Sequence, residues 1–595
     1  MDKRYYVDES KPWFKKEAGW PDEVPKNIDF PRMTLGEMLR GTAKKYPDYK
    51  AIWFGTGAIQ EWVTFKELDE YVDRVASAFH AMGLKKGDVV TMLLPNSIQY
   101  VVCYYACARI GAIASGINPT YKPAEVLHQV KTVGTRAMVV LDSLYDNCVA
   151  PIRDKAGIEM MISTNIVDLV NLGFVKKTLG KLLKKIPTGN VPDSTPFMKL
   201  LNHEIKLPDV KLDADDTATY IMTGGTTGVP KAAVLSHFNC VSNCHQAAAW
   251  LYKAKAGGGV LGVIPTFHSF AMTCVMNISC HLGTFMVLFP RPPATEEMIK
   301  RIEELAPPEG LMYVGAEILF KRLADYPNIG SYNLSGKLTL CVSGAGPLHR
   351  PVQESFEKNV GGRLAEGYGL TESSPVVSAH PFWGNRKLGT IGLPFPGTEW
   401  RIVDPTDHTK NLGMGGEDKM GELAVAGPQV MVGYLNRPEE TAETVVEMDG
   451  KKWLLTGDIG YMDNEGSVVL RDRKKQLIKH KGYSVYPKEV EELVGGHEMV
   501  SEVAVSGIPD EMDGEIIKAW VVLKPECRGK ITEDELLKWS KENMTHYKVP
   551  ALIQFIDELP KSMVGKVMRR ELQEADPLFK QRVAERKARD AGKKA

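Results

Sequence analysis

The sequence is poor in cysteine and has no net charge. Its 595 residues include nine cysteines, an odd number without a CxxC pair, which argues against a disulfide framework and favours a reducing compartment. Lysine plus arginine and aspartate plus glutamate each total 74, so no overall field attracts nucleic acid. We therefore expect a cytoplasmic protein that does not bind nucleic acid and whose partner is a small molecule.

Long apolar runs are also lacking. A membrane-spanning helix needs about 18 or more apolar residues in succession, and no segment of the sequence meets that condition. The nearest segment, residues 267–289, is interrupted by His268, Asn277, His281 and Gly283, and we interpret it as a buried helix and strand. The first residues, MDKRYYVDESKPWFKK, carry charges where a secretory signal needs an apolar core. No repeat or low-complexity tract is evident.

The length and the texture of the chain indicate several units. With 44% hydrophobic and 25% charged residues it has a globular composition, and 595 residues exceed what one core usually supports. Residues 33–200 and again 218–396 alternate helical patterns with short β-branched runs, which indicates parallel strands covered by helices. Up to residue 471, short segments such as TEWRIVD and GELAVAG predict a small antiparallel sheet or barrel.

A charged connector starting at Asp472 precedes a segment with its own helices and strands. The predicted fold class is therefore α/β, with a large N-terminal domain (1–471) of two αβ-layered subdomains and a small β-barrel-like subdomain. A small α+β C-terminal domain (472–595) follows. The tail beyond Lys580 is rich in Lys, Arg and Ala, and we expect it to be frayed.

A loop rich in glycine and threonine, TGGTTGVPK, lies between two strand-like runs. Glycines let backbone N–H groups converge on an anion, threonines add hydroxyl donors, and a lysine adds charge. The loop is not a P-loop of the GxxxxGK[ST] type, because Val229 and Pro230 come before its lysine. A glycine-rich hairpin turn is the alternative. The residues predicted to bind phosphate are Thr223, Gly224, Gly225, Thr226, Thr227, Gly228 and Lys231.

This loop is similar to the signature loop of the adenylate-forming superfamily, which includes acyl- and aryl-CoA synthetases, firefly luciferases and peptide-synthetase adenylation domains. Other signatures of the superfamily follow in its order, namely PTFH, SGAGPL, EGYGLTE, LTGD, DRKKQLIKHKGYSVYPKEVE and LPKSMVGKVMRRE. The resemblance extends from the first helix to Glu571. It implies an enzyme that uses ATP and Mg²⁺ to activate a carboxylic acid as acyl-adenylate, transfers the acyl group to coenzyme A, and has a mobile C-terminal domain.

The central signatures suggest a nucleotide site. Tyr368 offers a flat face to adenine, Thr371 offers a hydroxyl near phosphate, and Glu372 is a hard oxygen ligand for magnesium, shared with Thr226. Asp458, placed at a strand end, is suited to bind the ribose hydroxyls. Exposed or purely structural turns are the alternatives. The other residues assigned to this site from the signatures are Gly344, Ala345, Gly346, Glu366, Gly367 and Gly369.

Lys566 matches the lysine that similar enzymes use in adenylation, where a cation between carboxylate and triphosphate reduces their repulsion. Arg473 resembles the family arginine that meets the nucleotide, and Lys475 matches the hinge position. Surface charges are the alternative for each. Neither residue before Gly565 is a serine or threonine, so we expect Lys566 to lack a neighbouring hydroxyl. The residues expected to approach the site after domain rotation are Lys479, Lys481 and Gly482.

His268, in PTFH, matches the position where relatives place an aromatic or histidine side chain between acyl pocket and adenylate; a core histidine is the alternative. The small residues expected to leave room for the acyl group are Gly315, Ala316, Gly344, Ala345 and Gly346. The signature EGYGLTESSP looks most like fatty acyl-CoA synthetases, so we expect a medium- or long-chain fatty acid, with an aromatic or alicyclic acid second. Rival hypotheses are a carrier-protein-loading adenylation enzyme, a luciferase-like oxidase and a catalytically silent nucleotide-binding module.

Two other patterns have a plainer interpretation. His237, Cys240, Cys244 and His245 look like metal ligands, but at helical spacing His245 points away from the other three, and we expect no zinc there. The stretch that begins at Ile166 and ends at Ile186 carries lysines among apolar residues. We favour a helix packed on the domain, with peripheral contact to the inner face of a membrane as the alternative. A homodimer is one further hypothesis.

Overall fold

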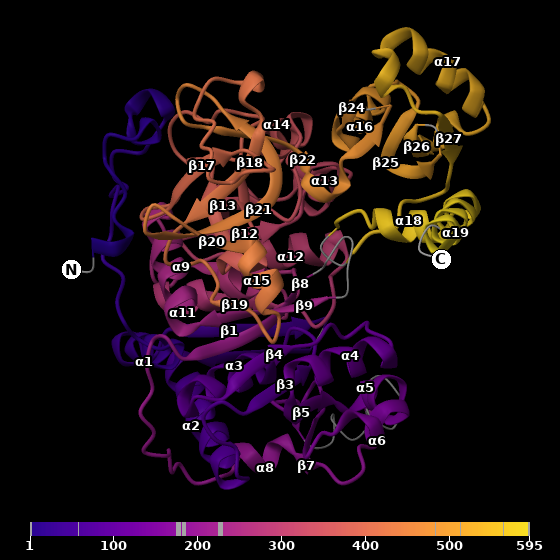
Figure 1. The fold of residues 1–595 in the computed structure, drawn as a ribbon. Coiled ribbons are helices and arrows are strands. Elements are labelled where there is room, and N and C mark those ends of the chain that lie inside the picture. Colours follow the sequence, from indigo (N-terminus) through magenta and orange to yellow (C-terminus); the bar gives the residue numbers. More distant parts are fainter. Residues whose placement is uncertain are drawn as a thin grey trace.

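The computed structural model describes residues 3–57, 59–173, 180, 186–223, 230–481, 483–511, 513–562 and 565–592. Figure 1 shows a large body, built by the chain from its N-terminus through β22, and a smaller body in yellow and gold that carries α16 to α19. The predicted α/β class, with a large N-terminal part and a small C-terminal part, is confirmed.

The first sheet of the large body has the strand order β19-β9-β8-β4-β3-β5-β6-β7. Its centre is parallel, whereas β8 and β9 form an antiparallel pair. All five residues of β3 are buried, as expected for a strand covered on both faces. The strands are β3 (Val89–Leu93), β4 (Ile113–Gly116), β5 (Thr135–Leu141), β6 (Met160–Thr164), β7 (Thr195–Pro196), β8 (Thr217–Thr223), β9 (Lys231–Ser236) and β19 (Gly433–Tyr434).

The second sheet has the order β16-β15-β14-β13-β12-β10-β11-β1-β2 and is parallel from β14 to β1. Its strands are β1 (Lys50–Thr56), β2 (Ile59–Thr64), β10 (Gly259–Gly262), β11 (Phe285–Leu288), β12 (Leu311–Gly315), β13 (Leu338–Ser343), β14 (Arg363–Gly369), β15 (Val376–Ala379) and β16 (Leu393–Pro394). The two predicted αβ-layered units are present as two sheets, but the predicted segments 33–200 and 218–396 do not match them. β1 and β2 from the first segment belong to the second sheet, and β8 and β9 from the second segment belong to the first sheet.

Helices cover both sheets, and several begin at side-chain caps. Thr34, Thr64 and Ser236 each form a capping box at the start of α1, α2 and α9, respectively. The longer helices are α1 (Leu35–Lys45), α2 (Phe65–Ala81), α3 (Ile98–Ile110), α4 (Pro123–Val133), α9 (His237–Trp250), α12 (Thr295–Leu305), α13 (Glu317–Ala324) and α14 (Arg350–Asn359). The shorter ones are α5 (Asp142–Leu144), α6 (Arg153–Ala156), α8 (Phe197–Leu201), α10 (Ser269–Ala271), α11 (Ile278–Leu282) and α15 (Pro438–Thr444).

The segment 267–289 is a buried helix and strand, as predicted. A π-helical turn, Met272–Asn277, joins α10 to α11, and β11 follows. Among the described residues, no helix is both long and apolar enough to cross a bilayer.

The third sheet is the small antiparallel sheet predicted up to residue 471. In it β17, β18, β21 and β20 pair in that order, and β22 adds to β21. The strands are β17 (Glu399–Val403), β18 (Gly421–Ala426), β20 (Val445–Met448), β21 (Lys451–Met462) and β22 (Val468–Arg473).

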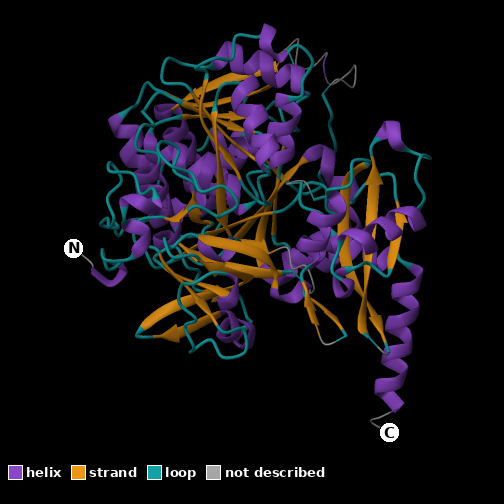
Figure 2. Cartoon of the chain, turned by 90° about the horizontal axis from the view of Figure 1, so that it is seen from above, coloured by secondary structure: helices purple, strands orange, loops and turns teal. Residues whose placement is uncertain are grey.

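The small body has its own sheet and core, and Figure 2 shows it beside the large body with helices packed on its strands. Its strands are β23 (Ile478–His480), β24 (Tyr483–Val485), β25 (Val500–Asp510), β26 (Gly514–Leu523) and β27 (Leu552–Phe555). Its helices are α16 (Pro487–Gly495), α17 (Glu533–Asn543), α18 (Arg569–Ala575) and α19 (Pro577–Gly592).

The expectation of a frayed tail after Lys580 is wrong for residues 581–592, because these residues continue α19; residues 593–595 lie outside the described part of the chain. The carboxylate of Asp576 accepts a hydrogen bond from the backbone N–H of Phe579 at 3.1 Å and so caps the helix. Asp576 is itself buried, and it forms an ion pair with Lys518 on β26. A helix that begins at a buried, charge-paired cap is anchored where composition alone predicts disorder.

The two patterns set aside in the sequence occupy different settings. His237, Cys240 and Cys244 lie on α9 and are fully buried, and His237 Nδ1 accepts a hydrogen bond from Leu35 N at 3.3 Å. The ring of His245 lies instead 4.2 Å from that of His281. Of the stretch from Ile166 to Ile186, residues 174–179 and 181–185 lie outside the described part of the chain.

Candidate active site

The glycine- and threonine-rich loop joins the ends of a strand pair in the first sheet. Thr223 is the last residue of β8 and lies opposite Lys231, the first residue of β9. Gly224, Gly225, Thr226, Thr227 and Gly228 lie outside the described residues. The described ends therefore fix where the loop leaves and rejoins the sheet, and they place Lys231 at its base.

Lys231 lies against an aromatic ring that sequence reasoning missed. Its Nζ is 3.9 Å from the ring centroid of Tyr434, a cation–π distance. The hydroxyl of Tyr434 donates to Glu372 Oε1 at 2.7 Å. Burial and the nearby Lys475 lower the pKa of Lys231, against the opposing effect of Glu372 and other acids. Tyr434 thus connects the loop lysine, by its ring, to the predicted metal ligand, by its hydroxyl.

Two other predicted nucleotide residues, Arg473 and Tyr368, contact the carboxylate of Asp458, which is buried. Arg473 Nε lies 2.6 Å from its Oδ1, and the Tyr368 hydroxyl donates to its Oδ2 at 2.5 Å. Burial and the Asp458 carboxylate raise the pKa of Tyr368 well above its usual value, and the same carboxylate raises the pKa of Arg473. The result is a closely paired triad beside the pocket that Tyr368 lines.

The position of Asp458 differs from the expectation of a strand end. It lies inside the long strand β21, where Gly457 has a φ of 71° and the pairing register shifts nearby. The left-handed glycine produces an irregularity within the strand, so the LTGD turn signal does not terminate it. Asp458 consequently faces Arg473 across the β21–β22 ladder.

Lys566 comes from the small body and reaches this same group. Burial and the charge of Arg473 lower its pKa to about 8, while Asp458 and Glu372 act in the opposite direction. Gly565, with a φ of 79°, packs so closely on the large body that an added Cβ would lie 3.3 Å from Ile318 Cγ2. The structure therefore brings the predicted adenylation lysine to the predicted nucleotide residues.

The turn that carries Lys566 does have a hydroxyl beside it, contrary to expectation. Ser562 Oγ accepts a hydrogen bond from Lys566 N at 3.2 Å, and Ser562 N donates to Lys566 O at 2.8 Å. The two residues before Gly565, which the sequence analysis considered, lie outside the described residues. The hydroxyl comes from four residues back because the tight turn folds Ser562 onto the lysine backbone.

The sequence analysis also missed Arg569, a charged residue three positions after Lys566. Arg569 forms a bidentate ion pair with Glu491 at 2.7 and 2.6 Å, and its Nη1 donates to Gln476 Oε1 at 3.3 Å. Gln476 ends the short 3-10 turn that contains Lys475. Arg569 thus connects the lysine turn to the segment predicted to be the hinge and to α16.

His268 lines a pocket whose empty space, with the open mouth counted, is about 870 Å³. The same pocket is lined by Tyr368, Thr371, Gly344 and Ala345, and also by apolar and aromatic side chains. Burial and the charge of Lys566 lower the pKa of His268 to about 4, and its Nδ1 accepts a hydrogen bond from Phe270 N at 3.2 Å. The imidazole is therefore neutral at physiological pH.

The small residues expected around the acyl group divide into two sets. Gly344 and Ala345 line the pocket, and a Cβ on Gly344 would lie 2.9 Å from Phe270 Cζ. Gly315 and Ala316 are not among the lining residues; Ala316 instead lies beside Gly565. Gly346 is exposed.

The rest of the EGYGLTE signature lies where β14 reaches the pocket. Gly367, Gly369 and Thr371 line it, and the Thr371 hydroxyl lies 3.1 Å from that of Ser269. Glu366 is oriented differently: burial raises its pKa to about 7, and its charged neighbours are Lys488, His349 and Glu317. Because Lys488 belongs to α16, Glu366 faces the contact between the two bodies.

Three lysines of the connector region have separate surroundings. Lys475 is close enough to Lys231 to lower its pKa. Lys479 and Lys481 are exposed on the β23–β24 hairpin, where Lys481 pairs with Asp513 at 3.4 Å. Gly482 lies outside the described residues. In this arrangement Lys566 occupies the site, and the hairpin makes its contacts within the small body.

Comparison with known proteins agrees with this geometry. The sequence profile of the AMP-binding enzyme family matches residues 39–435, and that of the AMP-binding enzyme C-terminal domain matches residues 489–566. The long-chain-fatty-acid–CoA ligase of Bacillus subtilis (strain 168) is 37% identical over 579 residues, covering 96% of this chain and 99% of that protein.

Solved structures show the same fold. ATP-bound MatB from Rhodopseudomonas palustris has a TM-score of 0.76 and 25% identity, covering 91% of this chain and 99% of that one. A long-chain-fatty-acid–CoA ligase from Archaeoglobus fulgidus has a TM-score of 0.64 and 26% identity, with 89% and 98% covered. The resemblance inferred from the ordered signatures is confirmed, and the chain belongs to the family of AMP-binding enzymes.

Proposed function

We propose that the protein is an AMP-forming acid–thiol ligase that activates a medium- or long-chain fatty acid as acyl-adenylate and transfers the acyl group to coenzyme A. One observation carries the choice of acid. A single cavity is lined both by polar residues near the nucleotide site, His268, Tyr368 and Thr371, and by large apolar rings such as Trp250 and Phe395. Such a cavity suits a molecule with a carboxylate head and a long apolar tail. The Bacillus subtilis relative named above supports the same choice.

In the first half-reaction the carboxylate attacks the α-phosphate of ATP and pyrophosphate leaves. We assign the loop of residues 223–231 to the β- and γ-phosphates, with Lys231 at its base, and Asp458 to the ribose. Lys566 offsets the repulsion between the two anions as they approach. Its position beside Asp458 and Arg473 supports this role.

Magnesium fits the donor set. Mg²⁺ usually binds one or two protein oxygens together with substrate phosphates and water, and Glu372 supplies such an oxygen beside the loop lysine. Thr226, the second proposed ligand, lies outside the described residues. When bound, the ion would neutralise charge on the phosphates.

In the second half-reaction the small domain, proposed as residues 472–595, rotates relative to residues 1–471 and withdraws Lys566. We place the hinge at Lys475, in the short segment between β22 and β23. Rotation would bring the hairpin of Lys479, Lys481 and Gly482 to the site and admit the thiol of coenzyme A, which attacks the mixed anhydride and releases AMP. The exposure of Lys479 and Lys481 supports their availability.

We propose a cytoplasmic location for the protein. All nine cysteines are free, and most are buried. Homodimer formation and contact with the inner face of a membrane through residues 166–186 remain hypotheses that size-exclusion chromatography and vesicle sedimentation would test.

The test is a panel of carboxylates from hexanoate to octadecanoate, with benzoate and cyclohexanecarboxylate as aromatic and alicyclic alternatives. Pyrophosphate release and thioester formation are measured with and without coenzyme A. We expect fatty acids to support AMP-forming thioester synthesis that depends on coenzyme A. Activity with the ring acids alone, or acyl-adenylate formation without coenzyme A transfer, would overturn the proposal in favour of the alternative acids or a carrier-protein loader.

A further inference from the structure

Part of the pocket lining is an aromatic wall. Trp250, at the end of α9, lines it together with Leu251, Phe382 and Phe395. The Trp250 ring lies 5.4 Å from that of Phe395, and its Nε1 donates to the backbone oxygen of His380 at 3.2 Å. The indole is therefore held in one orientation in the pocket wall.

The layer behind Trp250 comes from the N-terminal segment. The ring of Trp20 meets that of Trp250 edge to face at 5.3 Å, and Phe14 meets Trp20 edge to face at 4.6 Å. Trp20 Nε1 donates to Val24 O at 2.9 Å, which fixes the ring. Phe14, Trp20 and Val24 are 5%, 6% and 3% exposed, so this segment is packed as core although it lies at the surface of the fold.

We call residues 12–24 the N-terminal strap. It contains the short 3-10 turns η2 (Pro12–Phe14) and η3 (Lys16–Ala18). Figure 1 shows this region of the chain, in indigo, along the outside of the large body near β17 before the chain reaches α1. The match to the AMP-binding family profile begins only at residue 39, so the strap lies outside the matched region.

The strap is attached to the two segments that carry Trp250, Leu251 and Phe382 of this wall. Gly19, with a φ of 90°, approaches so closely that an added Cβ would lie 2.8 Å from Asn385 O. Burial and the charge of the nearby Glu23 carboxylate raise the pKa of Tyr252, which lies two residues after Trp250. The ring of Trp13 packs on that of Trp400 at 6.1 Å. The strap thus fastens the α9 end and the segment around residues 380–385 from outside.

We infer that the strap is the outer wall of the acyl pocket and that the Trp250–Trp20 pair sets the longest acyl chain the enzyme accepts. This inference depends on the proposed function. A chain that grows toward Trp250 gains about fourfold in binding for each methylene it buries. A chain that reaches the indole gains nothing more, because it must displace a ring packed between Phe395 and Trp20. Specificity then rises with chain length to a limit and falls beyond it.

The wall has two layers, Trp250 and Trp20 behind it. We therefore expect successive substitutions to raise the chain-length limit in steps. Removing the Trp250 side chain leaves Trp20 as a second wall, so the limit moves outward without opening the pocket to water. Removing Trp20 alone leaves Trp250 without its backing ring and loosens the wall. Removing both lets the pocket reach the surface beneath the strap, and chain-length discrimination is lost. Neither ring belongs to the nucleotide site.

The experiment compares wild type, Trp250→Ala, Trp20→Ala and the double variant. Trp62→Ala is the matched control, because Trp62 on β2 packs edge to face on Phe285 and does not line the pocket. The readout is the kcat/KM ratio for octadecanoate over decanoate. We expect about a tenfold rise for Trp250→Ala, a smaller rise for Trp20→Ala, and no change for Trp62→Ala.

A second measurement begins with the wild-type protein, and this first part does not depend on how the variants fold. A fatty acid of the longest accepted length, carrying a photoreactive diazirine at its methyl end, should label Trp250 or its neighbours on α9. In Trp250→Ala a longer probe should label residues 12–24. Labelling elsewhere, or an unchanged ratio in both tryptophan variants, overturns the inference. Absence of any fatty acyl-CoA synthesis by wild type would instead overturn the proposed function.

Discussion

The carboxylate of Asp458 is held by the guanidinium of Arg473, with 2.6 Å between Oδ1 and Nε, across two adjacent strands. Asp458 belongs to the large body, and Arg473 is the last residue of β22, directly before the segment proposed as the hinge. The group that we propose binds the ribose is therefore coupled to the start of the connector. Ligand binding at Asp458 would change the contacts of Arg473, next to the segment where the domain rotation is proposed to begin.

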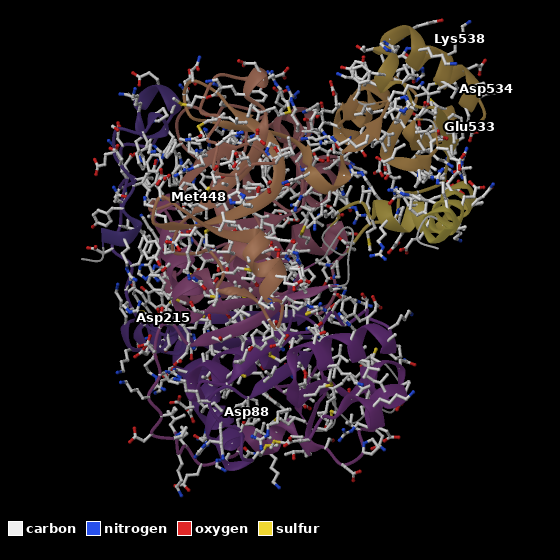
Figure 3. The ribbon with its side chains drawn as sticks, viewed as in Figure 1. Asp88, Asp215, Met448, Glu533, Asp534 and Lys538 are labelled. Carbon is white, nitrogen blue, oxygen red and sulfur yellow. The ribbon has the colours of Figure 1, made fainter. Side chains whose placement is uncertain are left out.

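The first prediction concerns Asp458→Asn. The amide keeps the shape but loses the charge that pairs with Arg473 and that would accept bonds from the ribose. Hydrogen bonds to charged groups contribute about 1.5–3 kcal/mol, so we expect KM for ATP to rise roughly 10- to 150-fold. Steady-state kinetics at saturating fatty acid measure this. Asp215→Asn is the control, because Asp215 lies at the edge of the large body (Figure 3) and pairs with Arg32 in solvent. An unchanged KM in Asp458→Asn would contradict the ribose assignment.

Tyr434→Phe tests the link between Lys231 and Glu372. The ring under Lys231 is kept, while the hydrogen bond that orients the Glu372 carboxylate is lost. We expect the rate of pyrophosphate exchange to fall about tenfold, with a higher Mg²⁺ concentration needed for half-maximal rate. Tyr461→Phe, on β21, is the control. If the Mg²⁺ dependence of Tyr434→Phe matches wild type, Tyr434 does not position the ligand.

The pH dependence follows from Lys566. Its pKa is lowered to about 8 by burial and by Arg473 and Arg569, so the ammonium is present below that pH and is lost as pH rises through it. Because kcat/KM reports the free enzyme, kcat/KM for acyl-adenylate formation should decline on the alkaline side with a midpoint near pH 8. Lys566→Arg keeps its charge and should shift the decline upward. The same midpoint in both proteins would show that another group is responsible.

Arg569 is expected to position the lysine turn. Arg569→Lys keeps the charge but loses the bidentate pair with Glu491. We expect acyl-adenylate formation to slow about tenfold with KM for ATP nearly unchanged, while thioester formation from supplied acyl-adenylate is kept. Arg570→Ala, at the next residue, is the control, since its side chain pairs with Glu574 in solvent. Equal loss of both half-reactions in Arg569→Lys would indicate only a general loss of structure.

Sequence patterns predict the layers of the fold and most of the site, for physical reasons. The buried run of β3 and the amphipathic α2 form from local periodicity, and the signature residues Tyr368, Asp458 and Lys566 come in ordered, specific motifs. Glycine positions such as Gly565 mark close backbone approach. These features depend on neighbours along the chain, so the sequence displays them directly.

The residues that were missed depend on contacts between distant segments. Tyr434 reaches the site because β19 pairs with β9, and Arg569 meets Glu491, 78 residues earlier. No periodicity encodes such a pair. Two sequence signals single these residues out. Tyr434 comes just before Asn436-Arg437-Pro438, and Arg569 is the first of two consecutive arginines that follow Lys566. Likewise, Asp458 lies within a strand and α19 is ordered because tertiary pairing overrides the local turn and tail signals.

The most direct test of the account separates the two half-reactions in Lys566→Ala. Lys538→Ala is the matched control, because Lys538 lies on α17 at the outer edge of the small body (Figure 3) and is exposed. The measurement pairs fatty-acid-dependent ATP–pyrophosphate exchange with thioester formation from supplied acyl-adenylate and coenzyme A. We expect Lys566→Ala to lose the exchange and to keep thioester formation, with Lys538→Ala like wild type in both. Equal loss of the two activities in Lys566→Ala, or exchange at the wild-type rate, would contradict the role of Lys566 as the charge that the small domain delivers to the first step.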